Sequence, residues 1–310
     1  MVSLHMVQIQ TPFELDNCRV LHLEMTTRCN ASCPQCDRND PLSGYSQDHE
    51  LTVEKLKSMF SEDFVKQLDK VFACGTFGDP AAAKECLEMF RWFRSINSTI
   101  TLGMNTNGGL RDTRFWMEVA DLFRQPHDYV VFSIDGMAST NPIYRVGVHW
   151  HKLMMNVESY IRAGGHAQWD MLVFEHNEQD VEHCKEKARG MGFTHFRAKV
   201  SNRFEEHPVE FLKQPTSYHP TVQPTGPVSC HAASERSLYV SATGHVLPCC
   251  FFGAEIFRSK ELLEWTENDP TYTNIAEKWN HEPHKVCTRN CSTRAAITAF
   301  DHQFRQEIAF

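Results

Sequence analysis

The hydrophobic positions of the chain follow two alternating periods over residues 19–200. Short runs of β-branched and aromatic residues, typical of strands, alternate with longer stretches whose apolar residues recur every three or four positions, as on one helix face. The predicted strands are residues 19–25, 70–74, 98–103, 129–134, 169–174 and 195–200. The predicted helices between them include residues 53–68, 81–93, 114–123, 152–163 and 179–191. This alternation favours βα units around a parallel sheet.

Six βα units are too few to close an eight-stranded barrel, so the pattern predicts an α/β fold with an open, partial (β/α)6 barrel. Prolines between residues 201 and 229 interrupt any helix or central strand there and indicate a linker. Beyond it, residues 238–247 read as a hairpin that turns at Thr243 and Gly244. The expected units are an N-terminal segment (1–18), the barrel (19–200), the linker (201–229), a small α+β domain (230–292) and a C-terminal helix (293–310).

Composition and charge narrow the class of protein. The chain has 310 residues, of which 41% are hydrophobic and 23% charged, as in a folded globular protein. No run reaches the roughly 18 apolar residues of a membrane span, and no basic start precedes an apolar core, so we expect a cytoplasmic protein without membrane attachment. The net charge of −8 argues against extended nucleic acid as a partner and leaves a single nucleotide or base open.

The chain contains 12 cysteines, which a reducing compartment would not keep as disulfides. Four of them stand apart in apolar surroundings and are expected to be small core residues. These are Cys18, Cys74, Cys86 and Cys184. The other eight form two groups at opposite ends of the chain, which indicates metal or cluster binding.

The first group lies directly after the first predicted strand. Cys29, Cys33 and Cys36 have the spacing Cys-x3-Cys-x2-Cys, with no fourth cysteine nearby. A structural zinc site needs four ligands, whereas three thiolates on a four-iron cluster leave one iron open to a small molecule. A chance triplet of buried or zinc-binding thiols is the alternative.

This triplet, in the loop after the first strand of a βα repeat, resembles the radical S-adenosylmethionine (SAM) superfamily. The resemblance implies that Cys29, Cys33 and Cys36 bind a [4Fe-4S] cluster whose open iron chelates SAM. An electron from the cluster then cleaves SAM to a 5′-deoxyadenosyl radical, which abstracts a substrate hydrogen. In one departure, Gln35 stands where members of the family usually have an aromatic or apolar residue.

The segment after the second strand, Gly75-Thr76-Phe77-Gly78-Asp79, is similar to the glycine-rich GGEP segment of the same family. Asp79 replaces the usual glutamate. The resemblance implies that backbone groups of this segment hold the ammonium group of SAM, and glycine permits their close approach.

Two further strand ends carry similar motifs. Asn105 and Asn107 lie in a stretch like the TNG turn of the family, although Asn and Gly are also ordinary turn residues. Ser133, Asp135 and Arg145 match the SxDG…YR pattern of its maturase-like branch. The resemblance makes Ser133 and Asp135 candidates for the ribose hydroxyls and Arg145 a candidate for the SAM carboxylate, with a surface salt bridge as the alternative role of Arg145.

The second cysteine group resembles the SPASM and twitch extensions of radical SAM enzymes. Cys230, Gly244 and Cys249 fit the C-x(9–15)-G-x4-C element that opens them. The group has too few cysteines for two auxiliary clusters, so one is expected, with Cys250 as a spare thiol or alternative ligand. A four-cysteine zinc site is the other possibility. The proposed ligands are Cys230, Cys249, Cys287 and Cys291.

These motifs define how the reaction starts and leave the substrate open. Oxidation or rearrangement of a small molecule is favoured by the compact extension. Modification of a peptide or protein side chain, and modification of a nucleotide or base, are alternatives, as is an iron–sulfur electron carrier without radical turnover. The expected cofactors are SAM and two [4Fe-4S] clusters, and the expected partners are a small-molecule or peptide substrate and a flavodoxin- or ferredoxin-like reductant.

Overall fold

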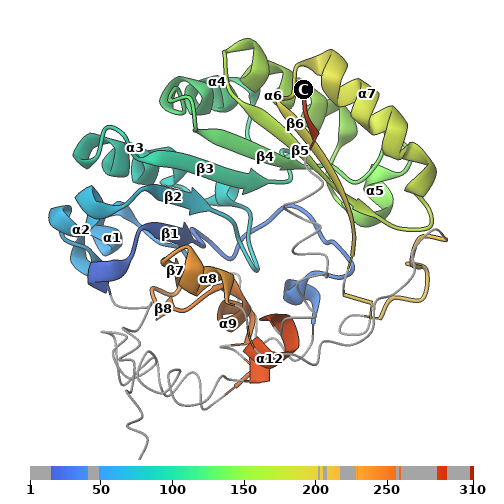
Figure 1. The fold of residues 1–310 in the computed structure, drawn as a ribbon. Helices are drawn as coiled ribbons and strands as arrows, with labels where there is room; N and C mark the ends of the chain where they lie inside the picture. The colour runs from blue at the N-terminus through green and yellow to red at the C-terminus, as the bar shows by residue number, and fades with distance from the viewer. Residues whose placement is uncertain are drawn as a thin grey trace, which may run out of the picture.

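A curved, mostly parallel sheet runs through the computed structural model (Figure 1). The structure describes residues 15–40, 49–201, 203–204, 208–216, 228, 230–255, 258–259, 285–291 and 308–310. The strands follow the order β8-β7-β1-β2-β3-β4-β5-β6-β9. Their bounds are β1 (Val20–Leu23), β2 (Lys70–Ala73), β3 (Thr101–Thr106), β4 (Tyr129–Ser133), β5 (Ala167–Val173), β6 (His195–Val200), β7 (Ser237–Val240), β8 (Val246–Leu247) and β9 (Ile308–Ala309).

Helices connect successive parallel strands. In the barrel they are α1 (Val53–Met59), α2 (Glu62–Gln67), α3 (Cys86–Ile96), α4 (Thr113–Leu122), α5 (Asn141–Tyr144), α6 (Trp150–Arg162) and α7 (Val181–Met191). Short 3-10 helices are η1 (Leu15–Asn17), η2 (Asp37–Asn39), η3 (Pro80–Ala82) and η4 (Glu178–Asp180). The C-terminal part adds α8 (His231–Ser234), α9 (Cys250–Glu255) and α12 (Lys285–Cys291). Among the described residues, no helix is long and apolar enough to cross a bilayer.

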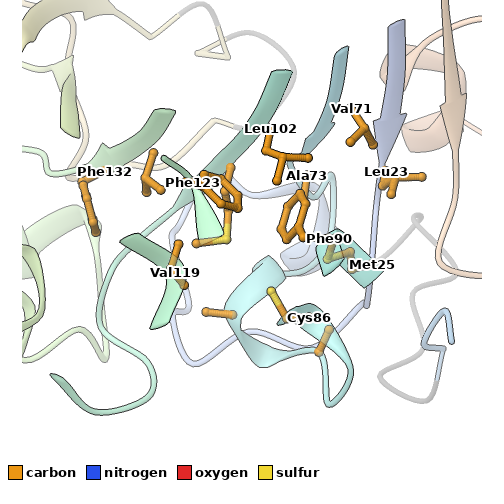
Figure 2. Packing of buried hydrophobic residues seen from close by; sticks show 14 of the residues in the cluster. Leu23, Met25, Val71, Ala73, Cys86, Phe90, Leu102, Val119, Phe123 and Phe132 are labelled. Carbon is orange, nitrogen blue, oxygen red and sulfur yellow. The ribbon is translucent and has the colours of Figure 1, made fainter. Parts of the chain in front are cut away.

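The core lies between the sheet and the helices on its outer side. Alternate strand residues face this layer, because successive side chains of a strand point to opposite faces. Figure 2 shows Ala73 and Leu102 of the strands beside Phe90 and Phe123 of the helical layer. The rings of Phe90 and Phe123 meet edge to face with centroids 4.9 Å apart. The other set of strand side chains therefore faces the interior of the barrel.

The predicted partial barrel is confirmed, since β1 to β6 form a parallel sheet in chain order. The sixth strand has the predicted bounds. The third begins at Thr101 rather than at residue 98, because the side chain of Asn97 accepts hydrogen bonds from the backbone and hydroxyl of Thr99 and holds a turn there. The helix predicted over residues 53–68 is two helices, and Ser61 caps the second by accepting from the backbone N–H of Phe64.

The C-terminal strands join the barrel sheet at both edges. The predicted hairpin is confirmed: β7 pairs antiparallel with β8 and parallel with β1. At the other edge β9 pairs antiparallel with β6, so residues 308–309 are a strand and not part of the helix predicted over 293–310. Residues 1–14, most of the linker over 201–229 and residues 292–307 lie outside the described residues.

Candidate functional site

The cysteine loop, residues 29–36, follows β1 and precedes η2. Its turns are held by local bonds: the backbone N–H of Cys36 donates to the carbonyl of Cys33 at 3.0 Å, and Asn39 Nδ2 donates to the same oxygen at 2.7 Å. The N–H of Ala31 points at Cys29 Sγ at 3.3 Å. Cys33 is buried, whereas Cys29 and Cys36 are partly exposed. The three thiols predicted as ligands therefore share one ordered loop.

Polar donors from other strand ends point at these sulfurs. Arg145 Nη1 lies 3.7 Å from Cys33 Sγ, and Asn107 Nδ2 lies 3.5 Å from Cys29 Sγ. Burial raises the pKa of Cys29 to about 12, and the charge of Asp79 adds to this rise. A metal centre binds the deprotonated thiolate and supplies the opposing positive charge. Three thiols on one loop, two of them facing N–H donors, therefore fit an iron–sulfur cluster.

The glycine-rich segment after β2 packs against the loop that follows β1. A Cβ atom on Gly78 would lie 1.8 Å from the carbonyl oxygen of Thr26, and one on Gly75 would lie 2.0 Å from the carbonyl oxygen of Gly78. Only glycine permits this approach. The backbone N–H of Phe77 donates to Glu24 Oε1 at 2.6 Å. The segment is therefore held beside the cysteine loop, where the sequence predicts SAM contacts.

Asp79 is a buried anchor within this region. Its carboxylate accepts from the backbone N–H groups of Ala81 at 3.0 Å and Asn107 at 2.7 Å, and from the hydroxyl of Thr106 at 2.9 Å. Burial raises the pKa of Asp79, and these donors oppose the rise. The observed bonds tie η3 to the end of β3, and a contact between Asp79 and SAM remains a prediction.

Asn107 connects the turn after β3 to the cysteine loop and to Asp79. Asn105 has no part in these described contacts. Asn107 Oδ1 accepts from the N–H of Gly109 at 2.8 Å, and Nδ2 donates to Asn30 Oδ1 at 2.9 Å as well as facing Cys29. Asn105 lies half-buried on the interior side of β3. The turn after β3 therefore braces the cysteine loop from the side.

The residues after β4 form a buried ion pair. Arg145 Nε donates to Asp135 Oδ2 at 2.5 Å, and the backbone N–H of Leu172 donates to Asp135 Oδ1 at 2.6 Å. Burial opposes the charged form of Arg145, but Asp135 and Cys33 outweigh it, so the pKa of Arg145 lies above its usual value. Ser133 is half-buried at the end of β4. The predicted salt bridge of Arg145 thus lies inside the site rather than on the surface.

Gln35 departs from the family pattern and is fully buried. The hydroxyl of Ser201 donates to Gln35 Oε1 at 2.7 Å, and Arg203 Nη1 donates to the Gln35 carbonyl at 2.9 Å. Ser201 follows β6 directly. The polar side chain therefore links the cysteine loop to the far edge of the parallel sheet, a contact that an aromatic residue could not make.

Glu24 and Tyr239 were missed by the sequence analysis. Glu24 is buried and accepts from the hydroxyl of Tyr239 at 2.6 Å as well as from Phe77. The Tyr239 oxygen also lies 3.3 Å from the hydroxyl of Thr76. The available signal was the single glutamate in the otherwise apolar end of the strand predicted over residues 19–25, because a buried carboxylate needs hydrogen-bond partners. These bonds connect the glycine-rich segment to the C-terminal strand β7.

The four separate cysteines divide into two kinds. Cys18, Cys86 and Cys184 are buried in the core, which confirms the prediction for them. For Cys74 the prediction is wrong: it follows β2 on the interior side, only partly buried by area, and is not a member of the core cluster. Burial raises the pKa of Cys74 to about 12, and the nearby Cys250 adds to the rise. The thiol faces the barrel interior because strand side chains alternate.

The second cysteine group lies on the three short C-terminal helices. Cys230 caps α8, with its Sγ 3.4 Å from the N–H of Ala233, and Cys249 directly precedes α9. Burial raises the pKa of Cys249, and Cys250 and Cys230 raise it further. Burial likewise raises the pKa of Cys291 to about 11, with Cys230 and Cys250 contributing. Cys230 and Cys250 therefore act electrostatically on both Cys249 and Cys291.

Cys287 belongs to the same helix as Cys291, one turn earlier on α12, and is buried. The helix packs against α9. Among the residues that the structure describes, no three His, Cys, Asp or Glu side chains converge closely enough to hold a single metal ion.

Comparisons with known proteins give the family. The Radical SAM superfamily model matches residues 23–188. The structure of SuiB from Streptococcus suis bound to S-adenosylmethionine has a TM-score of 0.58 at 13% identity, over 84% of this chain and 68% of that one. The structure of anSMEcpe with bound AdoMet has a TM-score of 0.55 at 14% identity, over 89% of both chains. BtrN in complex with AdoMet and 2-DOIA has a TM-score of 0.50 at 14% identity, over 88% of this chain and 92% of that one.

Identities this low carry the fold alone, and the comparison with curated proteins gives no match. The family model, however, covers more than half of the chain, including the cysteine loop, the glycine-rich segment and the Asp135–Arg145 pair. The chain belongs to the radical SAM superfamily.

Proposed function

We propose that the chain is a radical SAM enzyme with a SAM-binding [4Fe-4S] cluster on Cys29, Cys33 and Cys36. The observation that carries the proposal is the placement of the three thiols on one loop, with Arg145 pointing at the sulfur of Cys33 and Asn107 at that of Cys29. When bound, such a cluster supplies the electron that cleaves SAM to a 5′-deoxyadenosyl radical. The protein's own part is to hold SAM in place and to keep water out.

Arg145 is the proposed partner of the SAM carboxylate. Its Nε and Nη1 are engaged by Asp135 and Cys33. A guanidinium carries five N–H donors, so further donors remain for an anionic oxygen. The ion pair with Asp135 fixes the plane of the guanidinium and hence the direction of these donors. Asp135 and Ser133, at the same strand end, are proposed to accept from and donate to the ribose hydroxyls.

The glycine-rich segment from Gly75 to Asp79 is proposed to hold the SAM ammonium through backbone carbonyls. The support is its position against the cysteine loop, which the close approach of Gly78 to Thr26 requires. Phe77 and Thr76 are oriented by Glu24 and Tyr239, so their backbone groups have little freedom. Asn105 and Asn107 are proposed to complete the pocket from β3.

We propose one auxiliary [4Fe-4S] cluster on the second group, in a SPASM or twitch-type extension of residues 230–292. Support comes from the effect of Cys230 on the pKa of both Cys249 and Cys291, from the packing of α12 against α9, and from the location of Cys287 on the same helix as Cys291. A cluster with four protein ligands would transfer electrons or stabilise the fold rather than chelate substrate. Four-cysteine zinc remains the alternative occupant.

The proposed reaction is oxidation or rearrangement of a small molecule, with a flavodoxin- or ferredoxin-like reductant. BtrN, whose structure contains 2-DOIA, is the structural neighbour that supports this reading. Peptide modification is the second candidate, favoured by SuiB bound to the precursor peptide SuiA and by anSMEcpe bound to the Cp18Cys peptide.

The test is anaerobic reconstitution followed by measurement of iron per chain and of reductant-dependent 5′-deoxyadenosine. We expect about eight irons in the wild type and about four in the Cys29/Cys33/Cys36→Ala variant, which should lose deoxyadenosine formation. The matched control Cys18/Cys86/Cys184→Ala removes three thiols outside both groups and should keep iron and activity. A wild type that holds reduced cluster without forming deoxyadenosine would support the electron-carrier alternative.

A further inference from the structure

A second charged cluster lies inside the barrel, on β5 and β6. Asp170 on β5 is next to Arg197 on β6 in the sheet register. The two form an ion pair, and Lys199 Nζ lies 3.7 Å from the same carboxylate oxygen of Asp170. Trp169 and Phe196 on these strands pack in the outer core. Because strand side chains alternate, the three charged residues face the interior.

The cations in this region are not equally paired. Asp135 is paired with Arg145, and Asp170 with Arg197. Among the residues that the structure describes, the ion contact of Lys199 is the long one to Asp170, which exceeds the usual hydrogen-bond range of about 2.7–3.2 Å. Arg145, Arg197 and Lys199 thus share the carboxylates of Asp135 and Asp170, and Lys199 is the cation without a close carboxylate of its own.

Lys199 is buried enough for its charge to matter. Its side chain is 17% exposed, and burial lowers the pKa of the ammonium, with Asp170 opposing the shift. The Cys74 thiol across the barrel and Asp135 after β4 also influence its charge. Lys199 is the next-to-last residue of β6, so it lies near the carboxyl ends of the strands, where parallel α/β proteins bind ligands.

We propose that Lys199, supported by Arg197 and Asp170, anchors an anionic oxygen group of the substrate, a carboxylate or a phosphate, inside the barrel. An ammonium out of bulk water gains from an anionic partner that completes its hydrogen bonds. The Asp170 carboxylate orients the Arg197 guanidinium and neutralises its charge. The inference rests on the proposed function, because it assigns this interior to the substrate of that reaction.

The test is calorimetric titration of the reconstituted, SAM-saturated protein with glutarate, its uncharged diamide glutaramide, and inorganic phosphate. We expect one of the two anions to bind at least about tenfold more tightly than glutaramide. Preference for glutarate identifies a carboxylate substrate, and preference for phosphate a phosphorylated one. Absence of binding by both anions, or equal binding of glutarate and glutaramide without phosphate binding, overturns the proposal.

Variants locate the binding. Lys199→Met should weaken the preferred anion at least about tenfold, while Lys199→Arg, which keeps the charge, should stay within about threefold of wild type. Lys152→Met, on the exposed side of α6, is the matched control and should bind as wild type does. Unchanged anion affinity in a folded Lys199→Met protein overturns the proposal.

The same preparation separates this inference from the proposed function. Anion binding without deoxyadenosine formation would support the anchor and contradict the radical chemistry. Deoxyadenosine formation without anion binding would support the radical chemistry and contradict the anchor.

Discussion

The two cysteine groups are held in different ways. The cysteine loop is braced by the ends of several strands, through Asn107 after β3, Arg145 after β4 and Ser201 after β6. The second group lies on three short helices that reach the sheet through β7 and its pairing with β1. The difference indicates that the ends of the barrel strands shape the SAM site, whereas the C-terminal site is attached through β7 and through the ion pairs of Arg258 with Asp37 and Asp40.

Several contacts connect the two regions. Arg258, just after α9, pairs with Asp37 and Asp40, which follow the cysteine loop. Tyr239 on β7 donates to Glu24, directly after β1, and Glu24 also accepts from the backbone N–H of Phe77 in the glycine-rich segment. A change in the C-terminal part can therefore reach the SAM site through two hydrogen bonds. The variants Arg145→Met, Gly78→Ala and Tyr239→Phe test how strongly these contacts stabilise the protein and support SAM binding.

The largest effect is expected for Arg145→Met, which removes the cation from buried Asp135. Loss of one partner of a buried pair costs about 3–5 kcal/mol, so the free energy of unfolding should fall by that order and SAM binding should be lost. Denaturant unfolding and SAM titration measure both. Arg114→Met, which breaks the exposed pair with Glu118, is the control and should cost at most about 1 kcal/mol. An equal fall in the free energy of unfolding in the two variants would show that Arg145 and Asp135 do not form a buried ion pair.

Gly78→Ala should have the next largest effect. The new Cβ would meet the Thr26 carbonyl at 1.8 Å, so the segment must move, at about 1–3 kcal/mol, and SAM affinity should fall. Gly190→Ala in α7 is the control, because nothing lies within 4 Å of its Cβ position and alanine favours a helix by up to about 1 kcal/mol. Unaltered SAM affinity in Gly78→Ala would remove this segment from the site.

Tyr239→Phe removes one of the links between the regions. Glu24 loses the Tyr239 bond and keeps its backbone donors in the glycine-rich segment, and the loss of one partner of a buried acceptor costs about 1–3 kcal/mol. We expect weaker SAM binding although the substitution lies in the C-terminal part. Stability loss with unchanged SAM affinity would mean that the Tyr239–Glu24 bond does not couple the C-terminal part to the SAM site.

A pH dependence should come from Glu24. Burial raises its pKa above the usual 4.5, with Phe77 and Tyr239 opposing. Stability from a raised pKa is present below the unfolded value and is lost as pH rises through the folded one. Wild type should therefore lose stability relative to Glu24→Gln as pH rises above 4.5, by at most about 1.4 kcal/mol per pH unit. Parallel pH profiles of thermal unfolding would contradict this.

Local patterns explain what the sequence could predict. Period-2 and period-3.6 hydrophobicity located the six βα units, and the spacing of Cys29, Cys33 and Cys36 indicated the site because its residues are neighbours in the chain. The third strand was misplaced where a side chain, Asn97, competes for the backbone.

Long-range pairing explains what the sequence could not predict. The bond between Glu24 and Tyr239 joins residues 215 positions apart. Strand β7 lies beside β1 in the sheet, although the sequence of the whole barrel separates the two strands. No periodicity encodes such contacts. The interior position of Cys74 was missed for a related reason, since an isolated cysteine after a strand looks like a core residue until the barrel curvature is known.

Electron paramagnetic resonance can show whether SAM binds to the cluster on Cys29, Cys33 and Cys36, in a Cys230/Cys249/Cys287/Cys291→Ala variant that retains only the proposed SAM-side cluster. We expect that adding SAM to the reduced protein changes this spectrum, because SAM would bind at the open iron, and that Cys29/Cys33/Cys36→Ala shows no such change. A spectrum in the first variant that is insensitive to SAM, or a SAM response that persists in the second, would contradict this expectation.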